Sequence, residues 1–307
     1  MGDRPMMTVS VPDEAARIEL GSLPDGIRVL VWNGVDEIPA HGHEIEFFVG
    51  RFNTRPSRRT LESLPRLRVV QLVSAGVEPW LPVVPEGVVL CNGRGVHGGS
   101  TAELAVGGMT AMLRGIVPFA EAQRAHRWEQ RFTEGLDGGR VLVIGAGDIG
   151  GRIAAAVRAF GADVTLVARH ARPGVRGLTE LARLLPDQDV VALAVPHTDG
   201  THHLVDAGFL AALRDDALLV NVSRGGVVDT EALVAEVLKG RIRAFLDVTD
   251  PEPLPAGHPL WDAPNVLITP HVGTVRGWEK RAYRLVREQI RRLRDGDELV
   301  NRVAGRY

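Results

Sequence analysis

The sequence contains a single cysteine, Cys91, among its 307 residues. An intramolecular disulfide is therefore impossible, and we expect a protein of a reducing compartment, the cytoplasm. Neither sign of charge dominates, because 36 basic residues stand against 38 acidic ones and the net charge is −2. This balance does not indicate nucleic acid or an anionic membrane as the main partner.

Long apolar runs are also missing. The first twenty residues contain no apolar signal core, and the longest apolar helix candidate, residues 104–120, is interrupted by Arg114 and by glycines. The composition is that of a soluble globular chain, with 45% hydrophobic and 24% charged residues. The length suffices for about two domains.

The first hundred residues predict a small α/β domain that follows a loose tail at residues 1–20. Loops rich in glycine, proline and polar residues separate four β-like runs. These runs lie at residues 27–32, 44–49, 67–73 and 87–92. One long helix is expected next, over about residues 100–127.

From Arg140 onward, apolar runs alternate with helical segments. Strands are expected at 141–145, 163–168, 189–195, 217–222, 243–248 and 265–270. Helices are expected at 151–160, 178–185, 205–214 and 229–240, with a last amphipathic helix at about 277–294. The strands are continuously apolar, which is typical of a parallel sheet covered by helices on both faces.

Three glycines, Gly145, Gly147 and Gly150, follow the first of these strands and open a helix. In a dinucleotide-binding fingerprint the first glycine makes the turn, the second admits the pyrophosphate and the third lets helix pack on strand. The phosphates then face the helix N-terminus. A tight strand-to-helix corner without a ligand is the alternative, but the surrounding βαβ pattern favours nucleotide binding.

The end of the second strand bears on the choice of nucleotide. An NAD-binding site usually places a carboxylate there, for the ribose hydroxyls. Here Ala168 occupies that position and Arg169 follows it, with His170 and Arg172 close by. A guanidinium suits a 2′-phosphate, so NADP(H) is preferred while NAD(H) stays possible. A solvated surface arginine is the alternative interpretation of Arg169.

Charged side chains follow three later strands. Arg224, then Asp247 with Glu252, then His271 each come after a strand end, where ligands of open α/β sheets bind. An arginine can hold a carboxylate and polarise a carbonyl, and a histidine can transfer a proton near neutral pH. A glutamate beside the imidazole favours its charged form. Each residue alone has a structural explanation, but their occurrence at successive strand ends predicts an active site.

Over residues 67–290 the sequence resembles the D-isomer-specific 2-hydroxyacid dehydrogenase family. The motifs that carry the resemblance are SAGVE, STAELAVGGMTAMLR, GAGDIGGRI, AVPHTDGTHHLV, LLVNVSRGGVVDTEALVAEVLKGRI, LDVTDPEPLPAGHPLW and PNVLITPHVG. It implies that Arg224, Glu252 and His271 are catalytic. It also implies that Asp247 contacts the nicotinamide amide. Further cofactor contacts are implied for Thr101, Asp148, Ile149, Pro196, Thr201, Val222 and Gly273.

The resemblance also implies an architecture. A Rossmann-type, doubly wound parallel sheet (residues 99–275) is expected to bind the dinucleotide. A second, flavodoxin-like α/β domain (residues 1–98 and 276–307) is expected to bind substrate, with the backbone at Ala75 and Gly76, together with Arg224, receiving its carboxylate. Helix 100–127 resembles the family's dimerisation arm, so a homodimer is expected.

The implied reaction is the reversible transfer of a hydride from NADPH to a small 2-oxo acid, giving the D-2-hydroxy acid. Glyoxylate, hydroxypyruvate and larger 2-oxo acids are all admissible, and no metal site is predicted. Phosphite-oxidising members carry lysine at the position of Ala75, and formate-oxidising members carry glutamine at that of Glu252, so neither activity is expected. The alternative function is a cofactor-sensing, co-repressor-like binding protein, which the intact triad disfavours. Arg94 and His97 could contact a polar substrate tail or belong to a surface loop.

Overall fold

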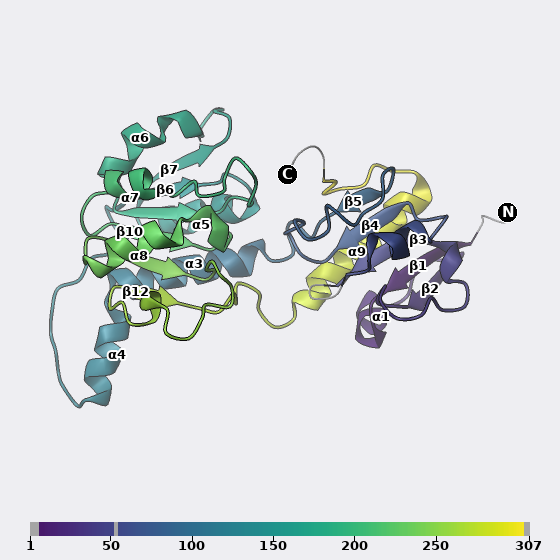
Figure 1. Cartoon of the computed structure of the whole chain (residues 1–307), viewed down its shortest axis with the longest axis horizontal. Coiled ribbons are helices and arrows are strands. Elements are labelled where there is room, and N and C mark those ends of the chain that lie inside the picture. Colours follow the sequence, from purple (N-terminus) through teal and green to yellow (C-terminus); the bar gives the residue numbers. More distant parts are fainter. Residues whose placement is uncertain (1–5, 52–54, 304–307) are drawn as a thin grey trace. The chain divides into compact units, whose positions relative to one another are not determined.

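The computed structural model describes residues 6–51 and 55–303. The chain divides into two compact units, each described here by itself (Figure 1). The first unit consists of Met1–His97 with Val275–Tyr307, and the second of Gly98–Thr274.

The first unit is built on a five-stranded parallel sheet with the order β2-β1-β3-β4-β5. Its strands are β1 (Met7–Val11), β2 (Ile27–Val31), β3 (Ile45–Gly50), β4 (Val69–Leu72) and β5 (Val89–Cys91). Its helices are α1 (Glu14–Leu20), the 3₁₀ helix η1 (Gly42–Glu44), α2 (Arg58–Glu62) and α9 (Trp278–Asp295). Both faces of the sheet are covered, and on one of them α1 and α9 pack over Val9 and Phe47. Burial raises the pKa of the Cys91 thiol to about 11, so this cysteine stays protonated.

The four strands expected in this unit are confirmed, but the expected loose tail is wrong. Residues 7–11 form β1, which lies between β2 and β3 in the sheet, and residues 14–20 form α1. Residues 1–5 lie outside the described range. The sequence does not indicate β1 because polar residues alternate with apolar ones in it. Thr8 and Ser10 are nevertheless completely buried. The Ser10 hydroxyl donates to the Trp32 carbonyl at 3.0 Å, which satisfies one of these buried groups.

The second unit contains a seven-stranded parallel sheet with the order β12-β11-β10-β9-β6-β7-β8. Its strands are β6 (Arg140–Ile144), β7 (Asp163–Ala168), β8 (Arg176–Gly177), β9 (Val190–Leu193), β10 (Leu218–Asn221), β11 (Arg243–Leu246) and β12 (Val266–Ile268). Its α-helices are α3 (Gly98–Leu113), α4 (Ile116–Arg124), α5 (Asp148–Ala159), α6 (Leu181–Leu184), α7 (Ala207–Ala212) and α8 (Thr230–Leu238). Short 3₁₀ helices lie at Leu178–Glu180, Leu185–Asp187, Gly225–Val227 and Pro259–Trp261. All six expected strands are present, and the two-residue β8 was too short to predict.

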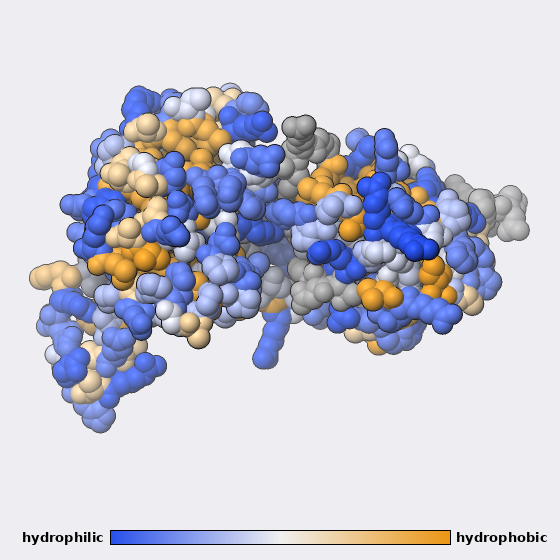
Figure 2. Space-filling view, in the orientation of Figure 1, coloured by the Kyte–Doolittle hydropathy of each residue, from blue (hydrophilic) through white to orange (hydrophobic). Residues whose placement is uncertain are grey.

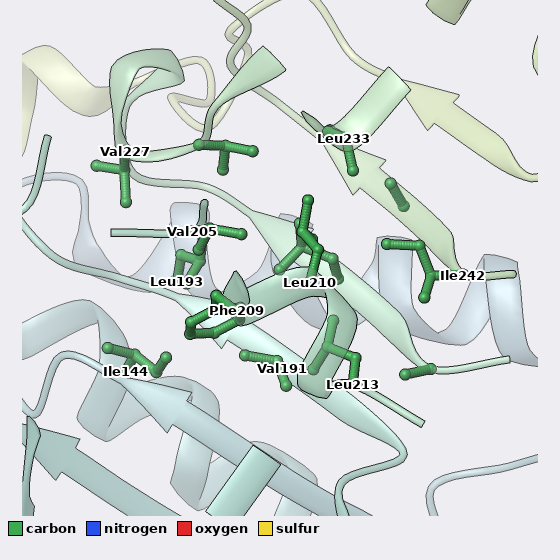
Figure 3. Packing of buried hydrophobic residues seen from close by; sticks show 14 of the residues in the cluster. Ile144, Val191, Leu193, Val205, Phe209, Leu210, Leu213, Val227, Leu233 and Ile242 are labelled. Carbon is green, nitrogen blue, oxygen red and sulfur yellow. The ribbon is translucent and has the colours of Figure 1, made fainter. Parts of the chain in front are cut away.

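Helices cover both faces of this sheet, which confirms the doubly wound α/β fold. On one face, strand residues such as Ile144 and Leu193 meet Phe209 and Leu210 of α7 (Figure 3). On the other face α3 and α5 supply a second buried cluster, which includes Met109. Because each strand is buried from both sides, its sequence is continuously apolar, as expected.

The single helix expected over residues 100–127 is wrong in detail. It is two helices, because Gly115 adopts a left-handed φ of 61° and ends α3 before α4 begins. Within its own unit, α4 projects away from the sheet (Figure 1), and hydrophobic and hydrophilic surface alternate on it (Figure 2). Trp128 and Phe132, in the segment after α4, are fully exposed. Within the described residues, no helix combines the length and the apolar character that crossing a membrane requires.

Candidate active site

The predicted functional residues of the second unit gather at the carboxyl ends of its parallel strands. The chain order reverses between β6 and β9, which are neighbours in the sheet. Open α/β sheets bind ligands at such a switch point. Loops that leave β6, β9, β10, β11 and β12 therefore all contribute to the same edge of the sheet.

The three glycines after β6 have distinct structural roles. Gly145 has a φ of 111°, and a Cβ there would collide with the Ala194 carbonyl. A Cβ on Gly150 would collide with the Gly145 carbonyl, so α5 packs directly on the turn. Gly147 is exposed and has open space beside it, and it caps the N-terminus of α5. The turn thus leaves room for an anionic ligand at the start of a twelve-residue helix.

The residues beside this turn are mostly charged, and one of them packs against the core. The Asp148 carboxylate accepts a hydrogen bond from Arg152 Nε at 2.8 Å, and Ile149 packs against the core. Arg169 is exposed and, among the described residues, forms no ion pair or hydrogen bond through its side chain. Arg172 reaches across to the glycine turn, where its Nη2 donates to the Ala146 carbonyl at 3.0 Å.

The loop after β9 is closed on itself. The Thr201 hydroxyl donates to the Pro196 carbonyl at 2.6 Å and accepts from the Thr198 amide at 2.8 Å. Val222, at the end of β10, is buried. These contacts fix the loop beside the glycine turn.

Arg224 follows β10 in extended backbone and is half-buried. One of its guanidinium nitrogens, Nη1, donates to the Ser223 carbonyl at 2.8 Å. The next residue, Gly225, has no space for a side chain, because a Cβ would collide with the Thr249 carbonyl. Sequence reasoning missed this glycine, which lets the Arg224 turn lie directly on the loop after β11.

Asp247 is the most deeply buried carboxylate of this edge, with 3% of the residue exposed. Its Oδ1 accepts from the Thr269 hydroxyl at 2.6 Å and from the Val272 amide at 2.9 Å. Its Oδ2 accepts from the Gly273 amide at 3.1 Å, and Thr101 of α3 donates to the Gly273 carbonyl at 3.3 Å. The carboxylate therefore fixes the segment that carries His271. Thr269 was not predicted, although it lies only two residues before His271.

His271 adopts a left-handed φ of 54°, and its backbone amide donates to the Asp247 carbonyl at 2.8 Å. Its Nδ1 lies 2.6 Å from Glu252 Oε1, although the two residues are 19 positions apart. About half of each side chain is exposed. Because Nδ1 is engaged by the carboxylate, Nε2 is the ring nitrogen left for proton exchange with a ligand.

Ala75 and Gly76 belong to the first unit, where they are half-buried in the loop after β4. Arg94 and His97, which the sequence allowed either to contact substrate or to belong to a surface loop, differ in exposure. Arg94 is exposed. His97 is buried, its Nε2 lies 2.9 Å from the Val73 carbonyl, and burial lowers the pKa of its imidazole.

Comparisons with known proteins show to which family the chain belongs. A family profile described as D-isomer specific 2-hydroxyacid dehydrogenase, NAD binding domain, matches residues 106–273, more than half of the chain. The chain is 34% identical over 230 residues to glyoxylate/hydroxypyruvate reductase B of Pectobacterium carotovorum subsp. carotovorum, covering 70% of this chain and 71% of that protein.

Two other comparisons extend over more of the chain. It is 29% identical over 270 residues to D-3-phosphoglycerate dehydrogenase of Methanocaldococcus jannaschii, covering 84% of this chain and 51% of that protein; it thus spans about half the length of this relative. A crystal structure of a D-isomer specific 2-hydroxyacid dehydrogenase from Xanthobacter autotrophicus Py2, in complex with NADPH and MES, matches with a TM-score of 0.87 and 29% identity over 98% of both chains.

Proposed function

This chain belongs to the D-isomer specific 2-hydroxyacid dehydrogenase family of NAD(P)-dependent enzymes, and on that premise we propose that it reduces a small 2-oxo acid reversibly to the D-2-hydroxy acid with NADPH. The observation that carries the proposal is the pair formed by His271 Nδ1 and Glu252 Oε1, 2.6 Å apart, at the strand edge that also carries Arg224. A proton donor and a carboxylate clamp are the two groups that reduction of a 2-oxo acid requires.

In this mechanism Arg224 holds the substrate carboxylate and polarises the adjacent carbonyl. The bound nicotinamide cofactor supplies the hydride. His271 gives a proton from Nε2 to the carbonyl oxygen, and in the reverse direction it takes that proton back. Glu252 holds the imidazole by Nδ1 and favours its charged form. The substrate carboxylate is also assigned to the backbone at Ala75 and Gly76.

We assign the cofactor to residues 99–275 and the substrate to residues 1–98 with 276–307. The open space at Gly147 and the start of α5 fit a pyrophosphate, and Asp247 retains a lone pair on Oδ2 for the nicotinamide amide. The proposed cofactor contacts are Thr101, Gly145, Gly147, Asp148, Ile149, Gly150, Arg169, Pro196, Thr201, Val222, Asp247 and Gly273.

Ala168 and Arg169 favour NADPH over NADH. The absence of a carboxylate at the end of β7 removes a repulsion, and two exposed guanidinium groups, on Arg169 and Arg172, follow it. The Xanthobacter relative was crystallised with NADPH. Steady-state kinetics with both cofactors test this preference. The double substitution Ala168→Asp with Arg169→Ala should reverse or erase it, and equal kcat/KM values in the unmodified protein would contradict it.

Glyoxylate and hydroxypyruvate are the first substrates to test, because the Pectobacterium relative is named for both. The decisive experiment screens a panel of 2-oxo acids, from glyoxylate to longer side chains, with NADPH and NADH. Turnover of at least one of them, with D-configured product, is expected. Tight NADPH binding without turnover of any of them would favour the alternative of a cofactor-sensing binding protein.

We further propose a homodimer through the helical stretch 100–127. The stretch ends in the projecting helix α4, and the segment after it exposes the large side chains Trp128 and Phe132 completely. Monomers seldom leave such side chains in water, so a second copy is their proposed partner. Trp128→Ala with Phe132→Ala should lower the sedimentation coefficient to that of a monomer. Phe160→Ala, at another exposed phenylalanine, should leave it unchanged.

A further inference from the structure

Three consecutive carbonyls of the first unit are all held by one other loop. The carbonyl of Val73 accepts from His97 Nε2 at 2.9 Å, and that of Ser74 accepts from the Gly93 amide at 2.6 Å. The carbonyl of Ala75 accepts from the side-chain amide of Asn92 at 3.0 Å. The loop after β4 is thus tied to residues 92–97, residue by residue.

This second loop is itself firmly held. Gly93 lies so close to the first loop that a Cβ would collide with the Val73 carbonyl. Asn92 and His97 are only 7% and 9% exposed, and Asn92 Oδ1 also accepts from the backbone amide two residues on, at 3.1 Å. Arg281 of α9 donates to the Val96 carbonyl at 2.8 Å. The loop can therefore act as a rigid support.

The hydrogen bonds to these carbonyls also set the direction of the N–H groups in the same peptides. In a trans peptide the N–H points opposite to the carbonyl of the preceding residue. Tying back the carbonyls of Ser74 and Ala75 therefore turns the N–H groups of Ala75 and Gly76 away from the supporting loop. Within residues 6–51 and 55–303 these two N–H groups form no hydrogen bond, and both residues are only half-buried. Donors presented in this way suit an anion.

We propose that Asn92 and His97 are positioning residues for the carboxylate of the substrate. Asn92 fixes the peptide between Ala75 and Gly76, and His97 fixes the peptide before Ser74, so that neighbouring N–H groups face the ligand. This inference rests on the proposed function, because it takes that carboxylate as the ligand. It assigns to the support loop a role in substrate affinity, with no contact to substrate or cofactor.

The test compares variants of the two side chains in the full-length protein. Asn92→Ala and His97→Leu each remove one donor. Each should raise the KM of the best 2-oxo acid about tenfold, because a tenfold change corresponds to the free energy of about one hydrogen bond. The Kd of NADPH should not change. His97→Gln retains an N–H donor at the position of Nε2 and should restore most of the affinity.

Ser10→Ala is the matched control. It removes a hydrogen bond of the same kind, from a buried side chain to a backbone carbonyl just after a strand of the same unit, and should leave KM unchanged. Amide hydrogen exchange at Gly93, whose N–H donates to the Ser74 carbonyl at 2.6 Å, provides a readout that does not need turnover. Exchange there should speed up in Asn92→Ala and His97→Leu but not in His97→Gln or Ser10→Ala.

The outcomes separate the two hypotheses. If the unmodified protein reduces a 2-oxo acid but the variants keep its KM, or Ser10→Ala raises KM equally, the positioning role is overturned and the proposed function stands. If the unmodified protein reduces none of the panel, the proposed function has failed and this inference fails with it. Unchanged amide exchange at Gly93 would refute the support itself.

Discussion

Among the residues that the structure describes, two exposed histidine–glutamate pairs are nearly alike. In the first unit His41 Nδ1 lies 2.8 Å from Glu44, and in the second His271 Nδ1 lies 2.6 Å from Glu252. Both histidines have a left-handed φ, 64° and 54° respectively, and about half of each imidazole is exposed. Distance and backbone therefore do not distinguish the two pairs, and their charges differ in one ion pair, which Glu44 forms with Arg28 at 2.7 Å.

Their connections in the fold do distinguish them. His41 and Glu44 are three residues apart at the ends of a single 3₁₀ turn, so local backbone alone brings them together. Glu252 and His271 come from the loops after β11 and β12, and buried Asp247 fixes the segment of His271. A pair that needs the folded sheet, at the strand edge that also carries Arg224, can have a fixed geometry toward a ligand. The His41 pair is held by one short turn and by Arg28 of β2.

The largest expected effect is that of His271→Ala, and His41→Ala in the other pair is its control. His271→Ala should lower kcat for 2-oxo acid reduction by about 10²–10⁴, the usual contribution of a general acid, because the carbonyl oxygen loses its proton donor. NADPH should still bind, as measured by fluorescence titration. His41→Ala, which removes the matching imidazole of the first unit, should leave kcat unchanged. Equal losses in both variants would show that the two pairs are equivalent.

Arg224→Lys tests the arginine at the strand edge of the His271 pair, which is proposed to bind substrate, whereas Arg28 of the first unit binds Glu44 itself. Lysine keeps the charge but loses the planar fork that fits a carboxylate, so kcat/KM for the 2-oxo acid should fall about 100-fold. The Kd of NADPH should change little. A near-normal kcat/KM would remove Arg224 from the active site.

The sequence predicts the second sheet and its charged loops well because the signal is local. An apolar run that ends in a charged residue, as before Arg224 and His271, identifies a strand end without knowledge of the fold. The break at Gly115 was missed although the sequence marks it: Gly115 followed by Pro118 is a signal for a helix end, which the apolar character of the stretch outweighed.

The parts that could not be predicted depend on contacts between distant segments. Thr8 looks like a polar loop residue, but it is completely buried in β1 between two neighbouring strands. The support that Asn92 and His97 give to the loop after β4 joins residues up to 24 positions apart. No spacing or residue type marks such a support, because its donors meet backbone carbonyls, which every sequence has.

Glu252→Gln should have a smaller effect than the two substitutions above. Glutamine can still hold the ring nitrogen of His271 but no longer supplies the negative charge that favours the imidazolium. The kcat for reduction should fall about tenfold at neutral pH and less at acidic pH, where bulk protons charge the ring. Glu44→Gln is the matched control. An equal loss at every pH would mean that Glu252 acts only by its shape.

The smallest expected effect concerns a third histidine, His97, which is buried where His41 is exposed. Burial lowers the pKa of its imidazole below the usual 6.5, so the folded state binds fewer protons there than the unfolded state. Stability rises with pH wherever the unfolded state binds more protons than the folded state. The free energy of unfolding should therefore decrease as pH falls below about 6.5, with a slope of at most about 1.4 kcal/mol per pH unit from this one group. Above that pH His97 costs the protein no stability. Far below it the loss becomes constant, once His97 is protonated in the folded protein as well. His97→Gln should flatten the slope, as measured by urea unfolding between neutral and mildly acidic pH. An unchanged slope would show that His97 takes up its proton as readily in the folded protein as in the unfolded chain.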